Sequence, residues 1–281
     1  MVRILPKELL NGVEIFYQLD GSGSDTLVLL NGIMMSTVDW FGLVPLYTKE
    51  YRILRVDFRN QGKSQYIDED FNIDIHVEDL KALLDKLSIE KVHMLGISYG
   101  GKVAMLFALK YQNMLQSLVL CNTTARVTKH LRDVEDLWIN VAMQYDGESF
   151  FKQIMPFIYS PKFCEENCKW IDNRVKAFGR VFKKPWFDAF IKLVESSHTY
   201  NILDKINEIR VPTLCIASEF DILTPIIELR MVQEHIDESE LIIISDAGHA
   251  PHFENKLEFN KAVLNFLMLN NEKAGLNNNC P

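Results

Sequence analysis

The sequence predicts an α/β fold whose mostly parallel central sheet is flanked by helices and carries an inserted helical cap. Two patterns support this fold class. Short apolar runs alternate with longer segments of helical periodicity, which is typical of doubly wound sheets. From residue 126 to residue 201 the alternation stops, and only helical patterns remain.

Seven apolar runs are predicted to form strands. Several are apolar almost throughout, as strands covered on both faces of a parallel sheet are. The runs span residues 13–19, 26–30, 51–58, 91–97, 115–121, 212–218 and 240–245. Four segments between or after them place apolar residues at helical spacing, namely 74–87, 99–111, 225–236 and 251–269.

The predicted domain organisation follows from these patterns. Residues 1–125 and 202–270 form the α/β core, and residues 126–201 form a helical cap inserted between two strands. The cap holds three of the four tryptophans, and it is expected over the strand ends, where such sheets bind ligands. The polar, Asn-rich residues 271–281 are expected to form a flexible tail.

Composition excludes several classes of partner. Acidic side chains outnumber basic ones by 38 to 30 over 281 residues, and without a basic block we expect no nucleic acid partner. The start "MVRILPKELL" has no long apolar run, so we expect a cytoplasmic protein without a membrane partner. A homodimer is compatible with the sequence.

The five cysteines are scattered and odd in number, so they do not indicate a disulfide framework. Cys164 and Cys168 share a face if their segment is helical, but no histidine or third cysteine lies nearby to complete a metal site. We therefore expect neither a metal nor a cofactor.

The stretch "LGISYGG" places Ser98 between a predicted strand and a predicted helix. This strand–turn–helix context is the one in which Gly-x-Ser-x-Gly exposes a serine on a sharp turn. Gly96 and Gly100 would allow the close backbone approach that such a turn needs. A serine hydroxyl is a weak nucleophile alone, so it requires a base.

The candidate base is His249 in "SDAGHAPHFE", which follows the last predicted strand. His252, three residues later, is the alternative. The candidate acid is Asp221 in "CIASEFDILTP", with Glu219 as its competitor. Helix capping is another role for Asp221, although Thr224 before Pro225 suits that position better.

Together these segments resemble the α/β-hydrolase superfamily over nearly the whole chain. "GISYGG" resembles its nucleophile elbow, "SEFDILTP" its acid loop and "DAGHAPHFENKLEF" its histidine loop. The order Ser98, Asp221, His249 is the order of that family. "VDFRNQGKS" is similar to a loop of the lactonase, esterase and C–C hydrolase branch, with Asn60 where glycine is usual.

The resemblance implies an oxyanion hole made by the backbone N–H groups of Ile33 and Tyr99. In the resembling enzymes a His-Gly pair follows the strand at this place, whereas this chain has Asn31-Gly32. Nearby, Arg59 and Asp57 are expected mainly to brace neighbouring loops.

The substrate pocket is expected to be apolar, because ligand pockets are mostly apolar with a few polar groups. Its predicted members come from the loop after the second strand and from the cap: Asn31, Met34, Met35, Trp138, Phe157 and Trp186. Most other aromatic residues of the cap are expected to pack its helices together.

These expectations favour a serine hydrolase that cleaves an ester, thioester or lactone of a small, largely apolar acyl compound, which could be linked to a carrier or to CoA. Two alternatives stay open. One is acyl transfer, thioester cleavage or C–C bond cleavage within a biosynthetic pathway. The other is a small-molecule receptor that keeps the hydrolase fold.

Overall fold

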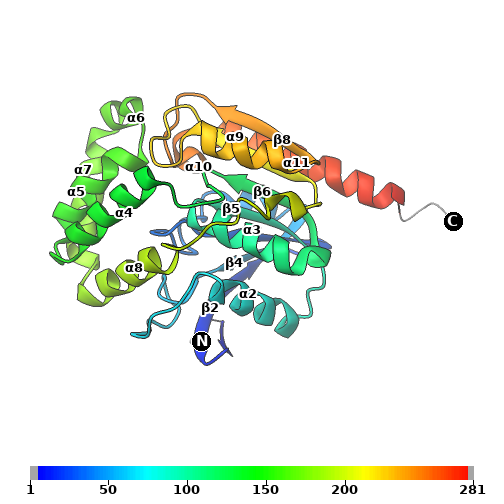
Figure 1. Cartoon of the computed structure of the whole chain (residues 1–281), viewed down its shortest axis with the longest axis horizontal. Helices are drawn as coiled ribbons and strands as arrows, with labels where there is room; N and C mark the ends of the chain where they lie inside the picture. Colours follow the sequence, from blue (N-terminus) through cyan, green and yellow to red (C-terminus); the bar gives the residue numbers. More distant parts are fainter. Residues whose placement is uncertain (1–5, 278–281) are drawn as a thin grey trace.

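The computed structural model describes residues 6–277 and contains an eight-stranded sheet with the order β1-β2-β4-β3-β5-β6-β7-β8 (Figure 1). The strands are β1 (Lys7–Leu10), β2 (Val13–Asp20), β3 (Asp25–Leu30), β4 (Tyr51–Val56), β5 (Val92–Ile97), β6 (Leu115–Cys121), β7 (Thr213–Ser218) and β8 (Ser239–Ile244). The six strands from β3 to β8 run parallel to one another, whereas β2 is antiparallel to both of its neighbours, β1 and β4. The predicted mostly parallel sheet is therefore correct.

Strand β1 was not predicted from the sequence. Its four residues KELL include only one buried side chain, Leu10, so they lack the apolar run of the central strands. The tight turn at Asn11 and Gly12, both with positive φ, folds β1 back onto β2.

Helices cover both faces of the sheet. The core on one face includes side chains of α2 (Ile75–Lys86), α3 (Tyr99–Tyr111) and α9 (Ile226–His235). The core on the other face includes side chains of α1 (Val44–Tyr47) and α11 (Lys256–Asn277). Short 3-10 helices, Gln112–Met114 and Ile206–Glu208, lie in the connections. The arrangement is the doubly wound one that the sequence predicts.

The C-terminal helical segment differs from the prediction in two ways. The expected helix 251–269 is divided into α10 (Pro251–Glu254) and α11, because Asn255 between them leaves the helical conformation. Helix α11 also continues to Asn277, whereas residues 271–281 were expected to form a flexible tail. Residues 278–281 lie outside the described part of the chain.

The segment between β6 and β7 contains five α-helices, which lie beyond one end of the sheet (Figure 1). They are α4 (Lys129–Ala142), α5 (Gly147–Ile158), α6 (Pro161–Glu166), α7 (Cys168–Val181) and α8 (Lys184–Ser196). Their apolar faces form a core of their own. An isolated antiparallel bridge between Arg126 and Asn201 joins the two ends of the segment, at the positions predicted as the limits of the cap.

The described residues contain neither a membrane-spanning helix nor a cluster of metal ligands. No helix among residues 6–277 is long and apolar enough to cross a membrane. Within the same range, no group of three or more His, Cys, Asp or Glu side chains could hold a metal ion. Cys164 and Cys168 are both free thiols in this part of the chain, while Cys280 lies outside it.

Candidate active site

Ser98 occupies a strained turn between β5 and α3. Its φ of 53° and ψ of −114° are unusual for a residue with a side chain. A Cβ on Gly96 would lie 2.4 Å from the carbonyl oxygen of Gly100, and one on Gly100 would lie 2.4 Å from that of Leu30. The two glycines are therefore required by close backbone contacts, as the sequence predicts, and they hold Ser98 at the carboxyl end of the sheet.

Asp221 and His249 reach the same end of the sheet from two later loops. Asp221 follows β7, His249 follows β8, and His249 Nδ1 lies 2.8 Å from Asp221 Oδ2. The carboxylate also accepts hydrogen bonds from the backbone N–H groups of Leu223 and Thr224 and from the Thr224 hydroxyl. Four donors around a buried carboxylate fix its position.

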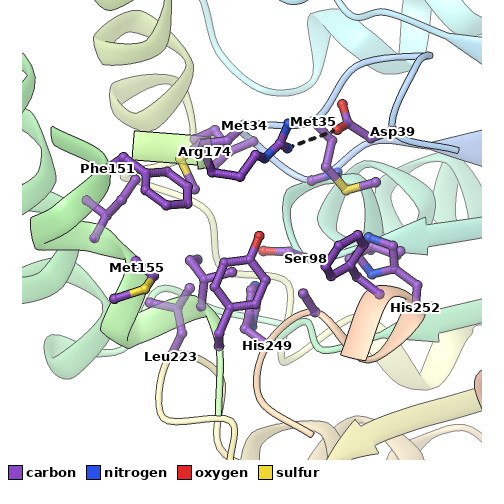
Figure 2. Close-up of a pocket in the computed structure, with 18 of the residues that line it drawn as sticks. Met34, Met35, Asp39, Ser98, Phe151, Met155, Arg174, Leu223, His249 and His252 are labelled. Carbon is purple, nitrogen blue, oxygen red and sulfur yellow. Dashed lines mark hydrogen bonds and ion pairs between the residues drawn. The ribbon is translucent and has the colours of Figure 1, made fainter. Parts of the chain in front are cut away.

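The other ring nitrogen of His249 is available for chemistry. His249 Nε2 is buried and has no hydrogen-bond partner among the described residues. His249 and Ser98 both line the large pocket under the cap (Figure 2). The structure gives no direct hydrogen bond between Ser98 and His249 within the described range, and such contacts often tighten only when substrate binds.

The two competing residues have other surroundings. His252 packs between Trp40 and Phe259, and its burial lowers its pKa to about 3, so it is a neutral ring at ordinary pH. Glu219 lies on the exposed side of its loop and accepts a hydrogen bond from the backbone N–H of Asp246. The geometry therefore favours the pair of Asp221 and His249.

The predicted oxyanion donors lie beside Ser98. Tyr99 is the first residue of α3, so its N–H has no acceptor within the helix. Ile33 follows Gly32 in a turn closed by a 3.0 Å hydrogen bond from Met35 N to the Gly32 carbonyl oxygen. Tyr99 directly follows Ser98 in the chain, and Ile33 and Ser98 both line the large pocket. These two N–H groups can therefore donate hydrogen bonds to an oxygen atom that becomes negatively charged next to Ser98.

Asn31 braces this turn and does not line the large pocket, so its predicted place in the pocket is wrong. Its amide donates to the Val56 carbonyl oxygen and to Gln61 Oε1, and it accepts a 2.6 Å hydrogen bond from Trp40 Nε1. Gln61 in turn donates to the Gly32 carbonyl oxygen. Asn31 is fully buried and belongs to the framework behind the oxyanion turn.

The large pocket has a volume of about 310 Å³ and lies between the sheet end and the cap. Figure 2 shows Ser98, His249 and His252 on the core side, with Phe151 and Met155 of α5 across the cavity. Of the predicted pocket residues, three belong to its lining: Met34, Met35 and Trp138. The lining is predominantly apolar, as expected.

Phe157 and Trp186 do not line this pocket, so their assignment was wrong. Phe157 packs against Trp138 from outside the cavity, and Trp186 stacks on Phe190 within the core of the cap. The lining instead takes Tyr159, Trp170 and further side chains of the cap: Phe151, Ile154, Met155, Ile158 and Phe178.

One charged pair also borders the pocket. Arg174 of α7 lies 3.8 Å from Asp39, which precedes α1 (Figure 2). The Arg174 guanidinium also lies over the ring of Trp170. The pair joins the cap to the core across the cavity. The sequence did not reveal it, because an isolated arginine on an amphipathic helix has no distinguishing pattern.

The comparisons with known proteins agree with this geometry. Residues 25–256 match the family model described as the alpha/beta hydrolase fold. The chain belongs to the α/β-hydrolase fold family. The match includes the cap as well as all three of Ser98, Asp221 and His249.

Individual relatives of this α/β-hydrolase span most of its length. "Serine hydrolase BPHL" of Homo sapiens is 28% identical over 273 residues, covering 93% of this chain and 85% of that protein. The "2-hydroxy-6-oxononadienedioate/2-hydroxy-6-oxononatrienedioate hydrolase" of Klebsiella pneumoniae is 27% identical and covers 88% of each chain. The crystal structure of MGS-M2, an alpha/beta hydrolase from a Medee basin deep-sea metagenome library, has a TM-score of 0.91 and 36% identity, covering 93% of this chain and 97% of that one. These names support hydrolysis as the reaction class.

Two positioning residues of this α/β-hydrolase were missed at the sequence level. Thr224 was taken as a helix cap, but its hydroxyl donates to Asp221 and lies 3.5 Å from His249 Nδ1. Glu254 accepts hydrogen bonds from the backbone N–H groups of Gly248 and, across to the cap, Ser160. The only sequence signal for Glu254 was its place in the histidine loop.

The expected bracing role of Arg59 and Asp57 has structural support. Arg59 makes two 2.7 Å hydrogen bonds to the buried carboxylate of Asp79. Asp57 accepts from the backbone N–H groups of Thr37 and Lys63, and burial raises its pKa to about 6. Neither residue lines the large pocket.

Proposed function

We propose that this hydrolase cleaves a carboxylic ester, thioester or lactone through Ser98, His249 and Asp221. The observation that carries the proposal is the 2.8 Å contact between His249 Nδ1 and Asp221 Oδ2. The Nε2 atom of His249 has no hydrogen-bond partner among the described residues, and His249 and Ser98 line the same pocket. In the neutral ring the Nδ1–H donates to Asp221. Nε2 then carries the lone pair and acts as the base.

In the first step, the Ser98 oxygen attacks the acyl carbonyl carbon while His249 Nε2 takes the hydroxyl proton. Asp221 stabilises the imidazolium that forms, because its carboxylate oxygen lies 2.8 Å from the ring Nδ1. The carbonyl oxygen gains negative charge, and the N–H groups of Ile33 and Tyr99 donate to it. His249 then gives its proton to the leaving alcohol or thiol as the acyl-enzyme forms.

In the second step, water attacks the acyl-enzyme and His249 takes one of its protons. The tetrahedral intermediate collapses, the bond to Ser98 breaks, and the proton returns to the Ser98 oxygen. The acid product is then released. The same base and the same oxyanion donors serve both steps, so no further catalytic group is needed.

The pocket supports a small and largely apolar acyl compound as substrate. A volume of about 310 Å³ is at the lower end of ordinary ligand pockets. Apolar side chains from the oxyanion loop and from α5 and α7 make up most of its lining. The pair of Arg174 and Asp39 adds no net charge to the wall.

The test compares Ser98→Ala with wild type on p-nitrophenyl acetate, butanoate and octanoate and on a thioester. We expect the variant to lose at least about 10³-fold in kcat/KM on every substrate that wild type hydrolyses. Ser149→Ala, on a cap helix where Ser149 contacts Gln153, is the matched control and should keep the wild-type rate. A Ser98→Ala enzyme with undiminished activity would refute the assignment.

A second candidate is hydrolysis of a carbon–carbon bond next to a ketone. The Klebsiella pneumoniae relative favours it, because the substrate in its name is an oxo dicarboxylic acid and contains no ester. Assaying 2-hydroxy-6-oxohexa-2,4-dienoate derivatives beside the esters separates the two. Turnover of the dienoates with no ester hydrolysis would favour this candidate.

A further inference from the structure

A small side cavity branches from the large pocket next to Ser98. Its volume is about 20 Å³, enough for one water-sized group. Four residues line both cavities, Ile33, Ser98, Trp138 and Leu223. The side cavity is therefore adjacent to the place where an acyl group would be bound to Ser98.

Two residues in the wall of the side cavity carry buried polar atoms without partners. Trp138 Nε1, a donor, and Glu135 Oε2, an acceptor, make no hydrogen bond to any described residue, and both side chains are almost fully buried. They are three residues apart on α4, so they lie on the same side of the helix. Unpaired buried polar atoms are costly, and a pair of opposite kinds at one cavity points to a ligand.

The rest of the wall defines what this ligand can be. Lys102 lies 3.5 Å from Glu135 Oε1 and also donates to the Ser197 hydroxyl, so the Glu135 charge is already balanced. His198 does not line the side cavity; its Nε2 lies 3.8 Å from Glu135 Oε2, too far for a hydrogen bond, and also has no hydrogen-bond partner among the described residues. An additional charge would be desolvated without a partner of its own, whereas a neutral group that both donates and accepts fits.

We propose that the side cavity binds a hydroxyl group on the acyl part of the substrate. Trp138 Nε1–H donates to the hydroxyl oxygen, and the hydroxyl donates to Glu135 Oε2. The inference rests on the proposed function, because it takes Ser98 as the atom that holds the acyl group. Since the cavity borders Ser98, the hydroxyl lies within a few bonds of the carbonyl, so the substrate class is a hydroxyacyl ester, thioester or lactone.

The test measures kcat/KM for ethyl butanoate, ethyl 2-hydroxybutanoate and ethyl 3-hydroxybutanoate by proton release. We expect wild type to prefer one of the hydroxy esters over ethyl butanoate by about tenfold, the factor for one good hydrogen bond to a charged acceptor. Trp138→Phe removes the donor and keeps an aromatic ring. It should lower this preference at least about fivefold, whatever its effect on absolute rates.

Trp170→Phe is the matched control, because Trp170 lines the large pocket but not the side cavity. The Trp170→Phe variant should prefer the hydroxy ester over ethyl butanoate by the same factor as wild type. Equal rates for all three esters, or a preference unchanged in Trp138→Phe, would show that the cavity holds water only and would overturn the inference while leaving the proposed function intact. Failure of wild type to hydrolyse any ester or to react with a fluorophosphonate would overturn both.

Discussion

Replacing Asp221 by Asn tests the hydrogen-bond geometry of the candidate active site. The carboxylate accepts from the backbone N–H groups of Leu223 and Thr224 through Oδ1, and from Thr224 Oγ1 and His249 Nδ1 through Oδ2. An asparagine that keeps its oxygen on the two backbone N–H groups must place its NH₂ group toward His249. The ring then accepts at Nδ1 and carries its proton on Nε2.

This change of tautomer removes the base without removing any side chain from the pocket. A protonated Nε2 cannot take the Ser98 proton, so we expect kcat to fall by about 10⁴-fold. The fold should tolerate the change, because the Thr224 hydroxyl can rotate to donate elsewhere. The free energy of unfolding should drop by only about 1–2 kcal/mol.

The assay is ester hydrolysis by Asp221→Asn together with urea unfolding of the same preparation. Glu219→Gln is the matched control, because Glu219 lies on the same loop and bonds the Asp246 N–H instead of His249. Its rate should stay within about twofold of wild type. The reasoning is refuted if Asp221→Asn keeps more than about a tenth of the wild-type kcat while remaining folded.

Three further predictions concern the framework around the site. Gly100→Ala places a Cβ 2.4 Å from the Leu30 carbonyl oxygen, so the backbone of the oxyanion turn must move. We expect kcat for ester hydrolysis to fall about 10²-fold, and an unchanged kcat would show that glycine is not required at this position. Burial lowers the pKa of His76 to about 3 in the folded protein, whereas the pKa of an unfolded histidine is 6.5. The neutral ring therefore contributes fully to the free energy of unfolding above pH 6.5, and this contribution is lost as the pH falls toward 3. Between pH 7 and pH 5, urea unfolding of His76→Gln should therefore show about 2 kcal/mol less acid destabilisation than wild type, and equal slopes would argue against a neutral buried ring. Arg59→Met leaves the buried Asp79 carboxylate without its ion-pair partner and should lower the free energy of unfolding by about 3–5 kcal/mol. The double variant Arg59→Met/Asp79→Leu should lose less than Arg59→Met alone, because no charge is then left buried. Losses that add up in the double variant would show that the two residues are not coupled.

The relation between sequence and structure is clearest at the sheet. The strands were predicted because parallel strands buried on both faces are largely apolar along their length, and β3 to β7 are buried almost throughout. The edge strand β8 was found from its apolar run, although only Ile244 in it is buried. Ser98, Asp221 and His249 each follow one of these strands, and the ends of parallel strands meet at one edge. Their proximity therefore follows from topology alone.

The cap could not be predicted to the same depth. An aromatic residue on an amphipathic helix can face either the helix next to it or the cavity, and helical periodicity does not distinguish the two. Trp138 lines the pocket and Trp186 packs inside the cap, although both lie on strongly amphipathic helices. The contact of Arg174 with Asp39 joins residues 135 positions apart, so it depends on how the cap is placed on the core.

Asn31 shows a different limit. Its position after β3 was identified correctly, but its role depends on four hydrogen bonds to residues 9 to 30 positions away. Glu254 is similar, because one of its partners is the backbone N–H of Ser160 in the cap. The sequence pattern around such a residue predicts its place in the fold, but it does not show which groups the side chain contacts.

Locating the covalent bond that the enzyme forms tests the role of Ser98 most directly. The protein is treated with a fluorophosphonate, digested, and analysed by peptide mass spectrometry beside Ser98→Ala. We predict one adduct, on the peptide that contains Ser98, and none in the variant. An adduct on another residue, or equal labelling of Ser98→Ala, would contradict the central claim that Ser98 is the nucleophile.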